Sequence, residues 1–92
     1  MTYEWDSGKA ERNRRKHGVS FEEAASIFRD IDALTFEDPE HSDEELREIT
    51  IGLSTQGRVL FVSHCDRGER IRIISARKAT PNERKQYAEG LL

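Results

Sequence analysis

Residues 48–76 read EITIGLSTQGRVLFVSHCDRGERIRIISA, and this stretch decides the fold. Three runs within it have the period-two alternation or the continuous apolar character of β-strands. They span residues 48–54, 58–65 and 70–76. Polar segments that contain a glycine separate the runs, as turns do in β-hairpins. We therefore expect consecutive antiparallel strands, with residues 70–76 paired to residues 58–64 across a turn at 66–69.

The last of these strands carries several arginines, and its alternation assigns them to faces of the sheet. With strict period two, Ser75 lies on one side and Arg72 and Ile74 lie on the other. Arg77 then shares the face of Ser75, away from Arg72.

Upstream of these strands, the sequence predicts a short strand followed by a helix. Two aromatic residues alternate with polar ones over residues 2–5, as in a strand with one buried side. Asp6 or Ser7 then caps a helix that runs to about Lys16, and Gly18 stands where a terminating glycine belongs. The helix is polar nearly all round, so it is either held by packing at its ends or presents a working face.

A second helix, over residues 20–28, has the clearest amphipathic pattern in the chain. Ser20 and Glu23 have the spacing of a capping box, in which the hydroxyl and the carboxylate each accept a hydrogen bond from a backbone N–H. Residues 33–36 are a candidate short strand, and residues 37–45 form a polar loop.

The last helix has the strongest start signal. Thr80, Pro81 and Glu83 combine a capping box with a proline at the first helical position. The resulting order of elements is β-α-α-β-β-β-α. We expect an α+β fold in which helices pack on an antiparallel sheet, as a single domain over residues 1–92.

Composition argues against two classes of protein. The sequence has no apolar run close to the roughly 18 residues of a membrane span, and we expect no secretory signal. Cys65 is the single cysteine, so an intrachain disulfide is excluded and a reducing cytoplasm is the expected location. We expect neither a membrane protein nor a disulfide scaffold.

The net charge of −3 conceals an uneven distribution. Residues 1–21 carry five Lys and Arg against three acids, residues 22–48 carry eleven Asp and Glu against two arginines, and residues 49–92 carry eight Lys and Arg against four acids. Such segments are either solvated faces or a basic groove for a polyanion. In the second case the acidic segment screens the groove or meets a basic partner.

The sequence carries no metal or cofactor motif, and we predict neither. Its three histidines have no ligand spacing, and a phosphate-binding glycine run is absent from the sequence. Cys65, at the end of an apolar strand, fits a packed thiol better than a nucleophile. The remaining groups for chemistry are lysine, arginine and histidine, which cluster in the first helix and around the last strand. They are Lys9, Arg12, Lys16 and His17, then Arg70, Arg72, Arg77 and Lys78.

Metal-free RNA cleavage needs little beyond such groups, because the 2′-OH attacks the phosphorus, a base and an acid move protons, and cations stabilise the developing charge. His17 ends the first helix, where the dipole favours a charged ring, so it is either the general acid or a simple cap. His64 is a rival acid, but burial in an apolar strand should lower its pKa. Arg77 is either catalytic or a tie to the acidic segment.

Two longer motifs resemble the BrnT family of toxins. They are KHGVSFEEA at residues 16–24 and RIISAR at residues 72–77. Shorter matches accompany them at Trp5, Asp6, Lys9, Asn13, Arg47, Ile51, Gly52, Gly57, Arg58, Lys78, Ala79 and Glu83. The similarity covers nearly the whole chain.

This resemblance implies a RelE-like ribonuclease fold, metal-independent RNA cleavage that arrests translation, and an antitoxin of the BrnA type as partner. Such antitoxins carry a ribbon-helix-helix domain, through which the complex reaches operator DNA. We expect the catalytic residues to be His17, Arg47 and Arg77. We expect the RNA phosphate contacts to be Lys9, Lys16, Arg72, Ser75 and Lys78. The alternative is a non-enzymatic module that only binds an antitoxin or a nucleic acid.

Overall fold

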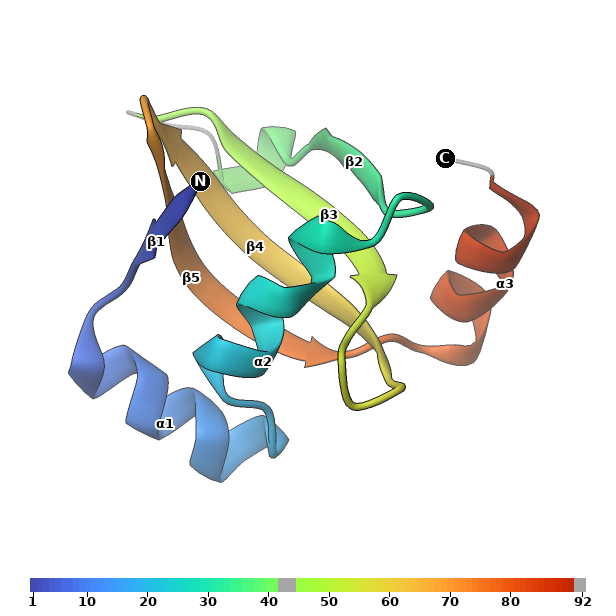
Figure 1. Cartoon of the computed structure of the whole chain (residues 1–92), viewed down its shortest axis with the longest axis horizontal. Helices are drawn as coiled ribbons and strands as arrows, with labels where there is room; N and C mark the ends of the chain where they lie inside the picture. Colours follow the sequence, from blue (N-terminus) through green and yellow to red (C-terminus); the bar gives the residue numbers. More distant parts are fainter. Residues whose placement is uncertain (42–44, 91–92) are drawn as a thin grey trace.

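The computed structural model describes residues 1–41 and 45–90, which form a sheet with helices packed on it (Figure 1). Its elements in chain order are β1 (Thr2–Glu4), α1 (Ser7–His17), α2 (Phe21–Ser26), the 3₁₀ turn η1 (Ile27–Arg29), β2 (Leu34–Glu37), the 3₁₀ turn η2 (Pro39–His41), β3 (Arg47–Leu53), β4 (Val59–Arg67), β5 (Arg70–Lys78) and α3 (Pro81–Glu89). None of the helices in the described residues is long and apolar enough to cross a membrane.

The α+β class is confirmed, but the sheet differs from the expected one in two ways. Its strands lie in the order β1-β5-β4-β3-β2, and β1 pairs with β5 in parallel, so the sheet is mixed rather than antiparallel. The candidate strand near residue 34 is real and pairs with β3, so four strands rather than three separate α2 from α3. The N-terminal strand can join the free edge of β5 because its Tyr3 then lies beside Ile71, with aromatic contact to Phe28.

The predicted pairing of the last two long strands is confirmed, with a bulge in it. The ladder runs from Leu60 opposite Lys78 to Arg67 opposite Arg70, and its register shifts between Ser63 and His64. The bulge inserts an extra residue, so strict alternation fails there. Its consequence concerns three residues of β5. Arg72, Ser75 and Arg77 lie opposite Cys65, Ser63 and Phe61, respectively.

Residues directly opposite in a ladder share a face, and the three partners on β4 are two residues apart. Arg72, Ser75 and Arg77 therefore point to the same side of the sheet. The prediction that Arg72 and Arg77 lie on opposite faces is wrong, because it assumed an unbroken alternation through Ile74.

The main core lies between this sheet and α2. Phe21 and Ile27 are fully buried against Leu60 and Val62 of β4 and Ile73 of β5. Burying five side chains of this size stabilises a domain by roughly 1.5–3 kcal/mol each. The predicted second helix is present but tightens into η1 after Ser26, so it is shorter than its amphipathic pattern.

Helix α1 is attached to the sheet by a polar side chain rather than by an apolar face. Asn13 is buried, and its side-chain amide donates to the carbonyls of Val19 (3.0 Å) and Ala76 (2.8 Å). Its carbonyl accepts from the backbone N–H of Ala76 at 3.1 Å. Each of these hydrogen bonds contributes about 1 kcal/mol, and loss of the Asn13 side chain would leave buried backbone groups without a partner. Apart from Ala10, which packs against the core, the rest of this polar helix is therefore available for function.

The expected capping box at the start of α2 is only half formed. The Ser20 hydroxyl accepts from the N–H of Glu23 at 3.0 Å, but the Glu23 carboxylate turns inward. It binds the Arg58 guanidinium and accepts from the Ser54 hydroxyl at 2.7 Å. The Arg58 guanidinium holds the pKa of Glu23 below its usual range. The Arg58 guanidinium outcompetes the backbone N–H because a charged donor binds a carboxylate more strongly.

Helix α3 begins with the complete capping box expected at Thr80 and Glu83, yet none of its described residues is buried. Polar contacts connect it to the rest of the chain. Glu83 pairs with Arg77, and the Tyr87 hydroxyl donates to Asp30 at 2.6 Å, which raises the pKa of Tyr87 to about 12. α3 therefore lies beside the sheet (Figure 1) rather than over its centre.

Candidate functional site

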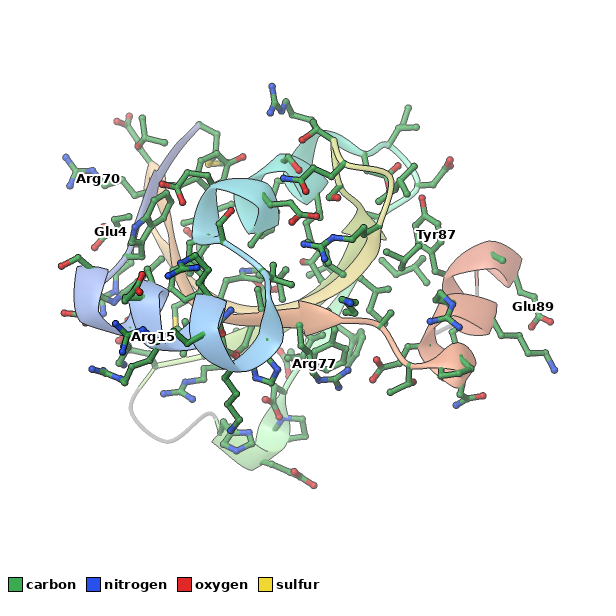
Figure 2. The ribbon with its side chains drawn as sticks, turned by 90° about the horizontal axis from the view of Figure 1, so that it is seen from below. Glu4, Arg15, Arg70, Arg77, Tyr87 and Glu89 are labelled. Atoms are coloured by element: carbon green, nitrogen blue, oxygen red, sulfur yellow. The ribbon has the colours of Figure 1, made fainter. Side chains whose placement is uncertain are left out.

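The sheet has one covered face and one more open face. Figures 1 and 2 show α2 on one side of the sheet and the η2 turn on the opposite side. On the η2 side lies a pocket of about 390 Å³. It is lined by Lys9, His41, Glu45, Arg47, Cys65, Arg67, Arg72 and Ile74. Four of these eight residues carry a permanent positive charge, in a protein whose net charge is −3.

Strand pairing sets the floor of this pocket. Arg47 of β3 lies directly opposite Cys65 of β4, which in turn lies opposite Arg72 of β5. Neighbouring strands are about 4.8 Å apart, so the backbones of the two arginines are about 10 Å apart on either side of the cysteine. Arg67 lies two residues beyond Cys65 on the same face, and Lys9 comes from the first turn of α1. This spacing can hold a phosphate between cations on both sides.

Two of the pocket arginines carry carboxylate counter-ions. Arg72 pairs with Glu4 at 3.1 Å, and Arg67 pairs with Glu45 at 2.7 Å. All four side chains are partly exposed, and ion pairs in such positions contribute at most about 1 kcal/mol each. The two pairs fix the directions of the guanidinium groups at little cost. An incoming phosphate can therefore take the place of either carboxylate.

Cys65 lies on the pocket floor as a buried thiol. Burial raises its pKa, because a thiolate loses its hydration there. A protonated thiol is a poor nucleophile, so the structure agrees with the expected packed side chain.

His41 lies at the rim of the pocket and was not among the predicted site residues. Its Nδ1 bonds the Asp38 carboxylate at 2.9 Å, and most of its ring is exposed. Asp38, Glu40 and His41 also place one ligand-type atom each within 4.8 Å of one another. Exposed acidic groups commonly gather in this way without an ion, so this turn is not assigned as a metal site.

The structure brings Lys9, Arg47 and Arg72 of the predicted site residues together in this pocket, and leaves the other five outside it. Ser75 and Arg77 share the face of the sheet but lie farther along β5. A strand rises about 3.3 Å per residue, and the partners of Arg77 and Arg72 on β4 are four residues apart, so Arg77 is about 13 Å from Arg72. In Figure 2, Arg77 lies away from Glu4, the ion-pair partner of Arg72.

Arg77 is engaged in contacts with α3 and β4. Its guanidinium donates to both carboxylate oxygens of Glu83, at 2.8 and 3.0 Å, and lies 4.0 Å from the centre of the Phe61 ring. A bidentate pair of this kind ties the end of β5 to the first turn of α3. The catalytic role of Arg77 stays a prediction.

Three further predicted residues lie elsewhere. Lys78 is opposite Leu60, which faces the α2 side, so Lys78 points away from the pocket face. Lys16 and His17 occupy the last turn of α1 and do not line the pocket. Their roles also stay predictions.

His64 is excluded as an acid in this pocket. It is buried on the α2 side, where its ring meets Phe28 edge-on at 4.9 Å and its Nε2 bonds the Thr50 hydroxyl at 2.7 Å. Burial lowers its pKa to about 4, as the sequence predicted in direction. At neutral pH its ring is uncharged.

Comparison with known protein families gives one match that covers most of the chain. The family described as "Ribonuclease toxin, BrnT, of type II toxin-antitoxin system" matches residues 5–83. This chain belongs to the BrnT family. The match spans all four cations of the pocket, from Lys9 to Arg72.

Among solved structures, the fold of this BrnT-family chain is similar to the crystal structure of the Brucella abortus ribonuclease toxin BrnT. The two share 23% sequence identity with a TM-score of 0.67, over 87% of this chain and 99% of the other. At this identity the similarity concerns the fold. A comparison with curated proteins gave no match.

Proposed function

We propose that this BrnT-family protein is an endoribonuclease toxin that cleaves RNA without a metal ion, with the pocket on the η2 side as its RNA site. The observation that carries this proposal is the gathering of Lys9, Arg47, Arg67 and Arg72 around one pocket of an acidic protein. Phosphate recognition needs local cations of this kind, and arginine offers a planar fork that matches phosphate oxygens.

The proposed chemistry is internal transesterification. The 2′-oxygen of one nucleotide bonds to the neighbouring phosphorus and the bond from phosphorus to the 5′-oxygen breaks, giving a 2′,3′-cyclic phosphate and a 5′-hydroxyl. Negative charge grows on the phosphoryl oxygens as this happens. We expect Arg47 and Arg72, which lie on either side of Cys65, to bind those oxygens from two directions.

The other predicted residues extend the proposed RNA path. A strand of RNA that leaves the pocket along β5 passes Ser75 and then Arg77 on the same face. Lys16 and His17 at the end of α1, and Lys78 on the far face, would meet RNA outside the pocket. The family resemblance adds a RelE-like fold. The length of the chain supports a single domain over residues 1–92, and its single cysteine supports action in a reducing cytoplasm, where mRNA is translated.

The partner we propose is an antitoxin of the BrnA type. Membership in a type II toxin–antitoxin family supports a protein antitoxin, and the resemblance adds a ribbon-helix-helix domain that carries the complex to operator DNA. Eleven acidic residues lie within residues 22–48, which suits a basic protein better than DNA. We therefore expect contact with DNA through the antitoxin alone.

The purified protein is expected to cleave RNA in excess EDTA, because its pocket stabilises phosphate charge with side-chain cations rather than with a metal ion. Gel analysis of a labelled RNA, with end-group mapping of the fragments, measures this. Loss of cleavage in EDTA that Mg²⁺ restores would contradict the metal-free mechanism. Folded protein that leaves RNA intact, and whose induction leaves translation running, would favour a non-enzymatic binding module instead.

A further inference from the structure

We propose that His41 is the general base of this ribonuclease, with Asp38 as the residue that positions it. The proposal rests on the function given above and adds to it the group that removes the proton from the 2′-hydroxyl. It places the base on the η2 turn, outside the motifs that identify the family in the sequence.

The geometry of the η2 turn carries this assignment. His41 lines the same pocket as the four cations, and its Nδ1 lies 2.9 Å from the Asp38 carboxylate. A carboxylate can only accept a hydrogen bond, so Nδ1 carries the hydrogen and Nε2 carries the lone pair. Within residues 1–41 and 45–90, Nε2 makes no hydrogen bond. The ring therefore presents a proton acceptor at the rim of the cationic pocket.

Asp38 is well placed to fix the direction of this ring. Its side chain is only 16% exposed, and its backbone N–H donates to the carbonyl of Arg47 at 2.9 Å. The backbone N–H of His41 in turn bonds the carbonyl of Asp38 at 3.3 Å. The η2 turn is thus attached to the first residue of β3, which itself lines the pocket. A histidine oriented by a carboxylate is the arrangement that serves proton transfer in many unrelated hydrolases.

The step balances without any further reactant. His41 Nε2 takes the proton of the 2′-hydroxyl as the 2′-oxygen bonds to phosphorus, and the bond to the 5′-oxygen breaks. The leaving 5′-oxygen takes a proton from solvent. His41 later returns its own proton to solvent, so charge and atoms are restored for the next turnover.

The charged groups that face His41 come from every wall of the pocket. Asp38 and Glu40 belong to its own turn. Cations face it from α1, β3, β4 and β5, and Glu45 precedes β3. These cations are Lys9, Arg47, Arg67 and Arg72. Imidazole suits the role of general base because it exchanges protons near neutral pH.

Other candidate bases in the pocket fit less well. Glu45 already accepts from Arg67 at 2.7 Å, and the Cys65 thiol is buried and protonated. His17 does not line the pocket, and His64 is buried on the other face. Among the described pocket residues, His41 is the group with an accessible lone pair and a fixed direction.

The experiment compares wild type with His41→Gln, Asp38→Asn and the matched control Glu40→Gln. Equal midpoints of thermal unfolding show that all four proteins are folded. Cleavage rates are measured on a labelled RNA in EDTA from acidic to neutral pH. We expect His41→Gln to be at least 100-fold slower, with no fall in rate at acidic pH. Asp38→Asn should be slower, but its cleavage rate should still fall at acidic pH because His41 is retained. Glu40→Gln removes a nearby charge but no atom of the proposed step, so its cleavage rate should stay close to that of wild type and should still fall at acidic pH.

A substrate with sulfur in place of the leaving 5′-oxygen, placed at the bond that the wild type cleaves, separates a base from an acid. A thiolate leaves without a proton, so loss of a general acid no longer matters on this substrate. We expect the defect of His41→Gln to persist there at its full fold-change. Recovery to the wild-type rate would overturn the assignment as base.

Three other results would also overturn the proposal. The first is an unchanged cleavage rate for His41→Gln. The second is a rate that still falls at acidic pH in His41→Gln but no longer falls in His17→Gln. The third is an equal loss of rate in Glu40→Gln and His41→Gln, together with a wild-type rate that EDTA abolishes and Mg²⁺ restores. The proposed function fails separately, if the wild-type protein does not cleave RNA at all.

Discussion

Replacement of Arg72 with alanine is expected to lower the rate of RNA cleavage about 100-fold or more. Arg72 lies on the floor of the pocket, opposite Cys65, and its guanidinium is held by Glu4 at 3.1 Å. In water-accessible but structured sites of this kind, a positioned cation stabilises the charge that develops on the phosphoryl oxygens. Single-turnover cleavage rates of the purified variant measure the loss.

Two comparisons show whether the loss belongs to the site. Arg72→Lys keeps the charge but loses the planar fork, so it should recover only part of the rate. Arg15→Ala removes an exposed arginine of α1 that pairs with Glu11, and should leave the rate unchanged. The ion pair of Arg72 with Glu4 is partly exposed, so the unfolding free energy of Arg72→Ala should differ from that of wild type by less than about 1 kcal/mol. Cleavage by Arg72→Ala at the wild-type rate would remove this residue from the site.

Acidification below about pH 6.5 is expected to destabilise the protein through His64, well before carboxylates protonate. His64 is 3% exposed, its pKa in the folded state is lowered to about 4, and its Nδ1 has no hydrogen-bond partner within the described residues. Burial is the main cause, because a charged ring would lose its hydration between Phe28 and Thr50.

The sign follows from which state binds the proton. In the unfolded chain His64 protonates near pH 6.5, whereas in the folded protein it stays neutral until about pH 4. The stability that the neutral His64 contributes is therefore fully present above pH 6.5 and is lost as the pH falls from 6.5 towards 4. The loss attributable to this residue should reach about 2 kcal/mol at pH 5.

Urea unfolding at a series of pH values measures this effect. His64→Gln keeps a hydrogen-bonding side chain for the Thr50 hydroxyl but cannot titrate. The variant should be less stable at neutral pH and should lack the additional loss between pH 6.5 and 5. Parallel pH curves for wild type and variant would contradict the prediction. Below about pH 4.5, protonation of Glu23 and Glu83, whose pKa values lie below their usual range, should destabilise both proteins alike.

Local sequence signals were sufficient for most of the fold because they depend on neighbouring residues. Caps at Asp6, Ser20 and Thr80 each sit at a helix start, and the three long strands follow their apolar patterns. The parallel pairing of β1 with β5 joins residues nearly 70 positions apart, between Thr2 and Arg70, and no local pattern encodes it.

The bulge at Ile74 had a larger effect on the site than on the fold. Alternation along β5 predicted that Arg72 and Ser75 lie on opposite faces, and a single extra residue brings both to the pocket side. A bulge depends on how two strands match each other, and a search of one strand cannot locate it. The predicted pairing of β4 with β5 is therefore correct despite the bulge, whereas the predicted assignment of side chains to the two faces of β5 is wrong.

Sequence analysis missed His41, Glu45 and Arg67 for two different reasons. His41 and Glu45 come from a polar loop without apolar periodicity, and such a loop offers no signal of where its side chains point. Arg67 was assigned to a turn, although it continues the face of Cys65 at period two and a longer strand would have included it. Lys9, Arg47 and Arg72 were found because the family resemblance or the clustering of cations selected them.

The central claim is that RNA binds in the pocket formed by Lys9, Arg47, Arg67 and Arg72, and the most direct test is a ¹H–¹⁵N NMR titration. The probe is a short RNA with 2′-O-methyl groups, which lacks the attacking hydroxyl and so stays intact. Chemical-shift changes should centre on the first turn of α1, the start of β3, the end of β4 and the first half of β5. Changes centred on α3 or on the α2 side of the sheet, or no changes at all, would contradict the claim.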